Sequence, residues 1–277
     1  MIAVFSFCAL LSGAQNFNPT YLQLVDSADM QIKKENWAVA ETYIIKALQS
    51  DPANKSNYLL WANLGMVRAN RNEHPAALEA FDIGLASAPN STSLLTARAM
   101  SLLAVGQPGE ALKDLDKALR TDSTLRKPLK LHGVVQAGLR KYDGAIKDFD
   151  RYEAIFGDDA DIQSARGDIA TSRQQPEEAL RHYKKTFELA GDEESLEKFL
   201  RAAYLFGHLE DEEETLRSAL ITFPRNGNLY LLRAALNRAR YQTQAMESDL
   251  KMARDLKADK TLTELITSKE NQTKPAK

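Results

Sequence analysis

Three things are scarce in this sequence, and each scarcity excludes a class of protein. Cys8 is the only cysteine among 277 residues, so neither an internal disulfide nor a cysteine-ligated metal site is expected. Surplus charge is small: the formal net charge is −2, with 36 Lys and Arg against 38 Asp and Glu. Nucleic-acid binding needs a basic excess that displaces counterions, so we expect no nucleic-acid partner. Long apolar runs are also scarce, because charges interrupt every apolar stretch after the N-terminus.

Catalytic and metal-binding motifs are missing as well. The four histidines lie far apart, and none has a second histidine three to five residues away, the spacing of common zinc sites. They are His74, His132, His182 and His208. Motifs of serine hydrolases, zinc proteases and phosphate-binding loops are absent. We therefore predict that the protein is not an enzyme and carries no cofactor or metal, and we interpret His132 as a structural histidine.

The first fourteen residues differ from the rest of the chain. Residues 2–11 are almost wholly apolar, and the small residues Ser12, Gly13 and Ala14 follow them. This pattern predicts a secretory signal peptide over 1–14, cleaved after Ala14, and a periplasmic or secreted protein. The run falls short of the ~20 apolar residues that span a bilayer, so no integral membrane span is expected. Because no Lys or Arg follows Met1, an apolar helix packed on the first repeat stays the alternative.

One pattern of small and large residues recurs along the chain. A small residue is followed four positions later by a large one and three positions after that by another small one, as in Ala77, Phe81 and Gly84. This spacing lies on one face of a helix. The first small residue recurs in three equal steps of 34 residues, at Ala77, Ala111, Ala145 and Ala179. In each repeat, an earlier set of residues at helical spacing comes before this pattern, and a turn that often contains proline separates the two. Each repeat is therefore predicted to contain two helices.

Trp61, Leu64 and Gly65, followed by Ala77, Phe81 and Pro89, resemble the tetratricopeptide repeat at its own period of 34 residues. The resemblance implies an all-α fold, a right-handed superhelical solenoid of about seven helical hairpins, with the first helix of each hairpin on the concave face. The predicted hairpins span 21–54, 58–91, 92–125, 126–159, 160–192, 193–226 and 227–260, an array over 21–260. Residues 15–20 are expected to lead into the array. A short capping helix is predicted over 261–268, and the polar residues 269–277 are expected to be disordered.

The outward residues of the first helices predict where a partner binds. In the first three hairpins this stripe is mostly apolar, as is common at interaction sites: Leu22, Val25, Asp29, Ile32, Leu59, Ala62, Met66, Ala69, Met100 and Leu103. In later hairpins it is polar: Lys127, Lys130, Asp168, Glu197, Arg201 and Tyr204. The alternative is that the apolar stripe is covered by residues 15–20 or by contacts between repeats.

We therefore expect an exported scaffold or adaptor that binds a partner protein or peptide in its concave groove. One alternative, by family analogy, is an assembly or regulatory subunit of an envelope complex for outer-membrane assembly or secretion. Another is a cytosolic chaperone-type adaptor, although only Asn63 matches the amide and basic cluster that such adaptors use to clamp an acidic tail. Self-association through an open end of the solenoid is a further alternative.

Overall fold

The computed structural model describes residues 19–268 and divides the chain into two compact units, Met1–Phe156 and Gly157–Lys277. Within the described residues the regular structure is entirely helical, without a strand, which confirms the predicted all-α fold class. The predicted signal peptide, the lead-in up to residue 18 and the tail 269–277 lie outside the described residues.

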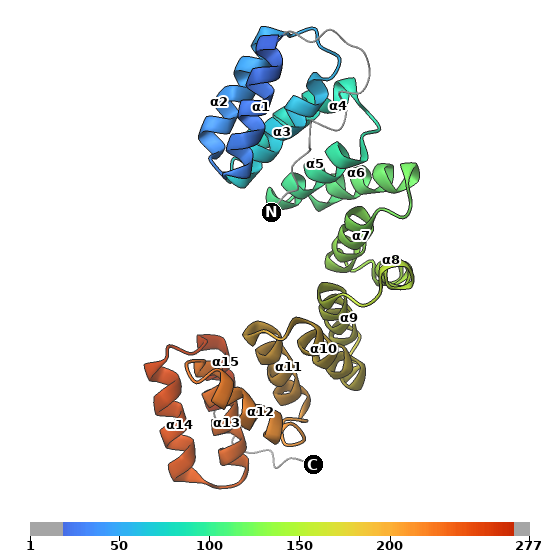
Figure 1. Ribbon diagram of the computed structural model, residues 1–277. Helices are drawn as coiled ribbons and strands as arrows, with labels where there is room; N and C mark the ends of the chain where they lie inside the picture. Colours follow the sequence, from blue (N-terminus) through green and yellow to red (C-terminus); the bar gives the residue numbers. More distant parts are fainter. Residues whose placement is uncertain (1–18, 269–277) are drawn as a thin grey trace. The chain divides into compact units, whose positions relative to one another are not determined.

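From residue 19 onward, the first unit contains four helical hairpins in chain order (Figure 1). Each helix packs on the helix that follows it, both inside a hairpin and from one hairpin to the next. The helices are α1 (Pro19–Lys33), α2 (Trp37–Ser50), α3 (Asn57–Asn70), α4 (His74–Ser87), α5 (Thr92–Ala104), α6 (Pro108–Thr121), α7 (Arg126–Gly138) and α8 (Tyr142–Phe156). The first helix therefore begins at Pro19, two residues before the predicted start of the array.

Up to residue 268, the second unit contains three hairpins and one further helix. Its helices are α9 (Ala160–Ser172), α10 (Pro176–Ala190), α11 (Glu193–Phe206), α12 (Glu213–Thr222), α13 (Gly227–Ala239), α14 (Thr243–Asp255) and α15 (Lys260–Thr267). The last helix, α15, overlaps the segment predicted as a cap and packs back on α13. The Arg238 guanidinium of α13 donates a hydrogen bond to the Ile266 carbonyl of α15, and the Asp259 carboxylate caps α15 by accepting from the Leu262 N–H.

Every hairpin turn contains one residue with left-handed backbone conformation. These residues are Glu35, Asn72, Gly106, Arg140, Gln174, Gly207 and Tyr241. The N–H of the residue that follows donates to the carbonyl five positions earlier, as from Gln107 to Leu102 at 2.8 Å and from Lys141 to Gln136 at 2.9 Å. This bond satisfies a carbonyl that the end of a helix would otherwise leave without a partner. The same turn geometry thus directs each second helix back along the first.

A close approach between the two helices of a hairpin explains the small residues in the repeat pattern. Gly133 of α7 faces the ring of Phe149 on α8, so closely that an added Cβ would lie 2.6 Å from the ring. Gly65 meets Phe81 in the same way, and Gly167 meets Tyr183. In each pair the ring lies sixteen residues after the glycine. Burial of such a ring contributes about 1.5–3 kcal/mol, and only a glycine leaves room for it at this separation.

We predict that Gly133→Ala destabilises the protein by about 1–3 kcal/mol, because the new methyl group would overlap the Phe149 ring and force the packed helices apart. The usual gain of Ala over Gly in a helix, about 1 kcal/mol, has the opposite sign and is the smaller effect. Urea denaturation of the full chain measures the difference.

Gly138→Ala is the matched control, because it lies in the same helix and an added Cβ there meets nothing within 4 Å. This variant should be neutral or slightly more stable than the wild type. Equal stability of both variants would contradict the packing that we assign to Gly133.

Candidate functional site

The apolar stripe predicted on the first helices is only partly exposed. Six of its ten residues are buried in hydrophobic clusters: Val25, Ile32, Leu59, Ala62, Met66 and Ala69. Met66, for example, is 2% exposed and belongs to the same cluster as Phe81 and Leu94. The helical spacing predicts an open face for these side chains, whereas the structure places them in the core, where they contribute to stability.

Four residues of the stripe keep intermediate exposure: Leu22, Asp29, Met100 and Leu103. Asp29 forms an ion pair of 2.6 Å with Lys33 one turn further along α1. The groove prediction for the first unit therefore stays a prediction, and it is restricted to the side chains that a partner can reach in this structure.

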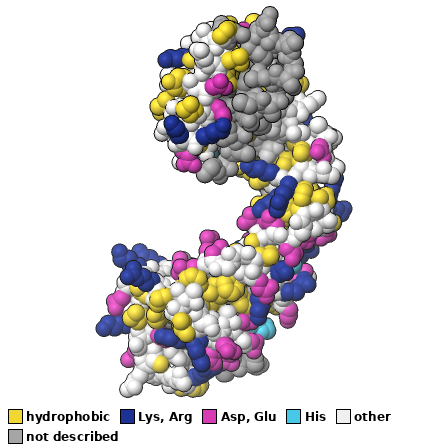
Figure 2. Space-filling model, viewed as in Figure 1, with side chains coloured by type: hydrophobic (Ala, Val, Ile, Leu, Met, Phe, Trp, Pro, Cys, Tyr) yellow, Lys and Arg dark blue, Asp and Glu magenta, His cyan; other side chains and the backbone are white. Residues whose placement is uncertain are grey.

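The polar residues predicted for the later hairpins belong to both units. Lys127 and Lys130 lie on α7 of the first unit, whereas Asp168 lies on α9 and Glu197, Arg201 and Tyr204 on α11 of the second. Glu197 and Arg201 line a defined hollow. On the face shown in Figure 2, Lys and Arg side chains mix with Asp and Glu over the second unit.

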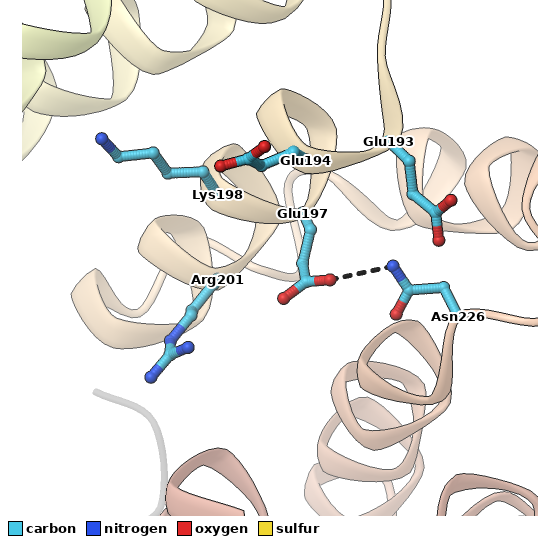
Figure 3. A pocket seen from close by; sticks show the side chains of 6 residues that line it. All are labelled: Glu193, Glu194, Glu197, Lys198, Arg201 and Asn226. Atoms are coloured by element: carbon cyan, nitrogen blue, oxygen red, sulfur yellow. Dashed lines mark hydrogen bonds between the residues drawn. The ribbon is translucent and has the colours of Figure 1, made fainter. Parts of the chain in front are cut away.

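The hollow is a pocket with a volume of about 440 Å³ along α11 and at the start of α13 (Figure 3). It is lined by Glu193, Glu194, Glu197, Lys198, Arg201 and Asn226. Residues 194, 197, 198 and 201 are three, four and seven positions apart, which places their side chains on one face of a helix. The Asp192 carboxylate caps the N-terminus of α11 by accepting a hydrogen bond from the Ser195 N–H at 2.7 Å.

Asn226 joins the two walls of the pocket. Its side-chain oxygen caps α13 by accepting from the Asn228 N–H at 2.9 Å, and its amide nitrogen donates to Glu197 at 2.9 Å. The side-chain amide of Asn228 donates to the other oxygen of Glu197 at 2.7 Å. The Glu197 carboxylate is thus held by two amides, and Figure 3 shows it pointing toward Asn226.

Lys198 points away from Asn226 toward the preceding hairpin (Figure 3). Its ammonium group lies 2.8 Å from Asp168 and donates to the Ser164 hydroxyl at 2.7 Å. The Tyr183 hydroxyl also donates to Asp168, at 2.8 Å. Burial raises the pKa of Tyr183, and the adjacent Asp168 carboxylate adds to the rise, so the hydroxyl stays a proton donor. Asp168 and Lys198 therefore connect the first helices of two hairpins.

Other charged groups of the pocket have no such partner. Within residues 19–268, neither Glu193, Glu194 nor Arg201 forms a hydrogen bond or ion pair through its side chain, and the Tyr204 hydroxyl on the next turn of α11 is also without one. Charged side chains without partners in a hollow can accept complementary groups from another molecule. This set can bind charged groups, but it has no nucleophile with an adjacent base.

Sequence reasoning found part of the pocket and missed the rest. Glu197 and Arg201 were predicted, and Glu194 shares their helical face, but Glu193, Lys198 and Asn226 were not included among the site residues. The spacing of Lys198 four residues after Glu194 could have suggested it. No sequence pattern links Asn226 to the residues of α11, because its position in the pocket depends on how α13 packs against α11.

Within the described part of the chain, no group of three or more His, Cys, Asp or Glu side chains could hold a metal ion. A search of the same residues finds no helix whose length and hydropathy would let it cross a bilayer.

Comparisons with known proteins agree with this architecture. A family model described as tetratricopeptide repeat matches residues 26–92, and no curated protein sequence matches the chain. A solved tetratricopeptide repeat protein from Parabacteroides merdae is 22% identical, with a TM-score of 0.68 over 90% of this chain and 98% of that one. The repeats, the paired helices and this likeness show that the described part of the chain has the tetratricopeptide repeat fold.

Two further solved structures share the fold. PilW, described as a widely conserved type IV pilus biogenesis factor, is 20% identical with a TM-score of 0.66, over 77% of this chain and 98% of that one. YrrB, described as a TPR protein with an unusual peptide-binding site, is 19% identical with a TM-score of 0.54, over 62% of this chain and 87% of that one. At these identities the likeness is one of fold.

We predict that Asn226→Ala lowers stability by about 1–2 kcal/mol, because it removes the cap of α13 and leaves Glu197 with one amide donor. Arg201→Ala should change stability by less than about 0.5 kcal/mol, since its guanidinium has no partner within the described residues. Urea denaturation distinguishes the two, and an equal loss in both variants would show that Arg201 also supports the fold.

Proposed function

We propose that this chain is an exported scaffold that binds a segment of a partner protein and has no catalytic activity of its own. The observation that carries the proposal is the pocket on α11, where Glu193, Glu194 and Arg201 have no partners within residues 19–268. Charged groups that the fold itself does not pair are available for complementary groups on another chain, where such contacts favour the correct partner over others.

The charges of the pocket define the chemistry of the expected partner. Glu193 and Glu194 offer carboxylates to a Lys or Arg side chain, and Arg201 offers a guanidinium to a carboxylate. Tyr204 adds an aromatic ring beside Arg201 on the same helix. A segment that carries a basic and an acidic residue fits this set better than a purely acidic tail, which the two glutamates would repel.

The fold supports the proposal by analogy. The chain shares its architecture with YrrB, which is described as having a peptide-binding site, and helical repeat arrays commonly bind extended or helical peptides along their first helices. Leu22, Met100 and Leu103, which keep intermediate exposure on the first unit, are a second proposed contact surface.

An assembly or regulatory role in an envelope complex is the second proposal. It draws on the likeness to PilW, a pilus biogenesis factor, together with the predicted signal peptide. Cell fractionation separates this role from that of a cytosolic chaperone-type adaptor, because the two place the protein in different compartments.

We predict that Arg201→Glu weakens partner binding at least about tenfold, because it replaces a charge-assisted hydrogen bond of about 1.5–3 kcal/mol by repulsion. In-cell crosslinking with mass spectrometry would first identify the partner, and calorimetry on the purified pair would then compare affinities.

Arg217→Glu is the matched control, because it makes the same charge change on α12 of the same hairpin, outside the pocket. Its affinity should stay within about twofold of the wild type, as expected for a site away from the contact. If both variants bind like the wild type, the pocket is not the contact surface. If both weaken equally, net charge rather than the pocket determines binding.

The proposed export of the protein can be tested separately from partner binding. N-terminal sequencing of the protein purified from its native host should begin at Gln15, the residue after the predicted cleavage site. A mature chain that still begins at Met1 would contradict the signal peptide and leave the binding proposal unaffected.

A further inference from the structure

One polar pair recurs at the same place in three hairpins. Arg98 of α5 forms a two-pronged bond to Asp114 of α6, with distances of 2.7 and 2.6 Å. Arg233 of α13 binds Asp249 of α14 in the same way, at 2.9 and 2.6 Å. In the hairpin of α7 and α8 the pair is His132 and Asp148, at 2.7 Å. The two members of each pair are sixteen residues apart.

In two of these hairpins the cation also reaches back to the preceding hairpin. Arg98 binds Asp82 of α4 at 2.6 Å, and His132 lies 3.2 Å from Asp116 of α6 through Nε2. Each of these carboxylates comes sixteen residues before its cation. A central cation therefore lies between two carboxylates, one inside its own hairpin and one in the hairpin before it.

His132 differs from Arg98 in one chemical respect. An arginine stays protonated at every pH that a folded protein meets, whereas a neutral histidine carries a single N–H. Both ring nitrogens of His132 face carboxylate oxygens. Two hydrogen bonds to two carboxylates therefore require the imidazolium, and loss of a proton leaves one nitrogen lone pair facing an anion.

The surroundings hold the ring in this position. Its side chain is 14% exposed, and the charged groups that face it are Asp116 from α6 and Asp148 from α8. Its own helix adds the uncharged Gln136, whose side-chain nitrogen donates to Asp148 at 2.7 Å and lies 3.0 Å from Nδ1 of His132. Gly144 of α8 leaves the space for that amide, since an added Cβ would collide with Gln136.

We propose that His132 makes the packing between the hairpins α5–α6 and α7–α8 depend on pH. The contact between the two hairpins is stable when the imidazole is protonated and weaker when it is neutral. Arg98 keeps its charge over the pH range in which histidine titrates, so its contacts hold the preceding pair of hairpins together there. His132 provides one contact between hairpins that a change of pH in that range can weaken. The proposal is independent of the partner and of the compartment.

The sign of the effect follows from the charges. Burial lowers the pKa of His132, but the hydrogen bond to Asp148 and the charges of Asp148 and Asp116 together outweigh it, so that the pKa is raised above the ordinary 6.5. A group whose pKa is raised by folding stabilises the folded state. This stabilisation is complete at pH values below the ordinary pKa of the group, and it is lost as the pH rises through the pKa of the folded state.

The test compares the wild type with His132→Arg, which supplies the cation that the neighbouring hairpin already uses. At about pH 6 both should show strong amide-exchange protection in α7. At about pH 8 the wild type should lose several-fold in protection and about 2–4 °C in its unfolding midpoint, whereas the arginine variant should lose neither. His208→Gln, which removes a half-exposed histidine elsewhere, should retain the wild-type dependence.

Direct titration of the His132 ring by NMR covers the case in which the arginine variant fails to fold. The wild-type ring should titrate above the ordinary histidine value, and Asp148→Asn should bring its pKa down. A wild-type ring that titrates below that value, or an arginine variant with the full pH dependence of the wild type, would overturn the proposal.

Discussion

In three hairpins the packing depends on one repeated contact, a glycine of the first helix against an aromatic ring of the second. Because Gly65, Gly133 and Gly167 have no side chain, the two helices approach until the ring fills the space between them. The separation of sixteen residues is fixed by this contact and by the left-handed residue in the turn. Any longer turn or larger residue would shift the ring out of its place.

The polar pairs share this register, offset by one residue. Arg98, His132 and Arg233 each come one residue before the repeat position that the glycine occupies in the hairpins above. Each acidic partner comes one residue before the repeat position that the aromatic ring occupies. An apolar contact and an ion pair therefore lie side by side in the same hairpin. The apolar contact supplies most of the stabilisation, while the ion pair restricts which alignment of the two helices is allowed, since a slip would strand a buried carboxylate such as Asp249.

The sequence predicts the helices well because they rest on local spacing. The period of 34 residues, the prolines at the starts of α4, α6 and α10 and the glycines can all be read directly from the order of the amino acids. Exposure is less predictable, because it depends on neighbours: Met66 and Ala62 occupy an outward helical position yet are buried. For the same reason Asn226 could not be placed in the pocket, since only the packing of α13 against α11 brings it there.

The short helix α15 has a consequence for assembly. It lies on α13, where Leu231 and Ala235 are buried, and it contributes Leu262 and Ile266 to the same cluster. A second copy of the chain that added its own hairpin to α13 would first have to displace this helix and break the bond between Arg238 and Ile266. Stacking of a second copy on α13 would therefore compete with α15 for the same buried apolar surface.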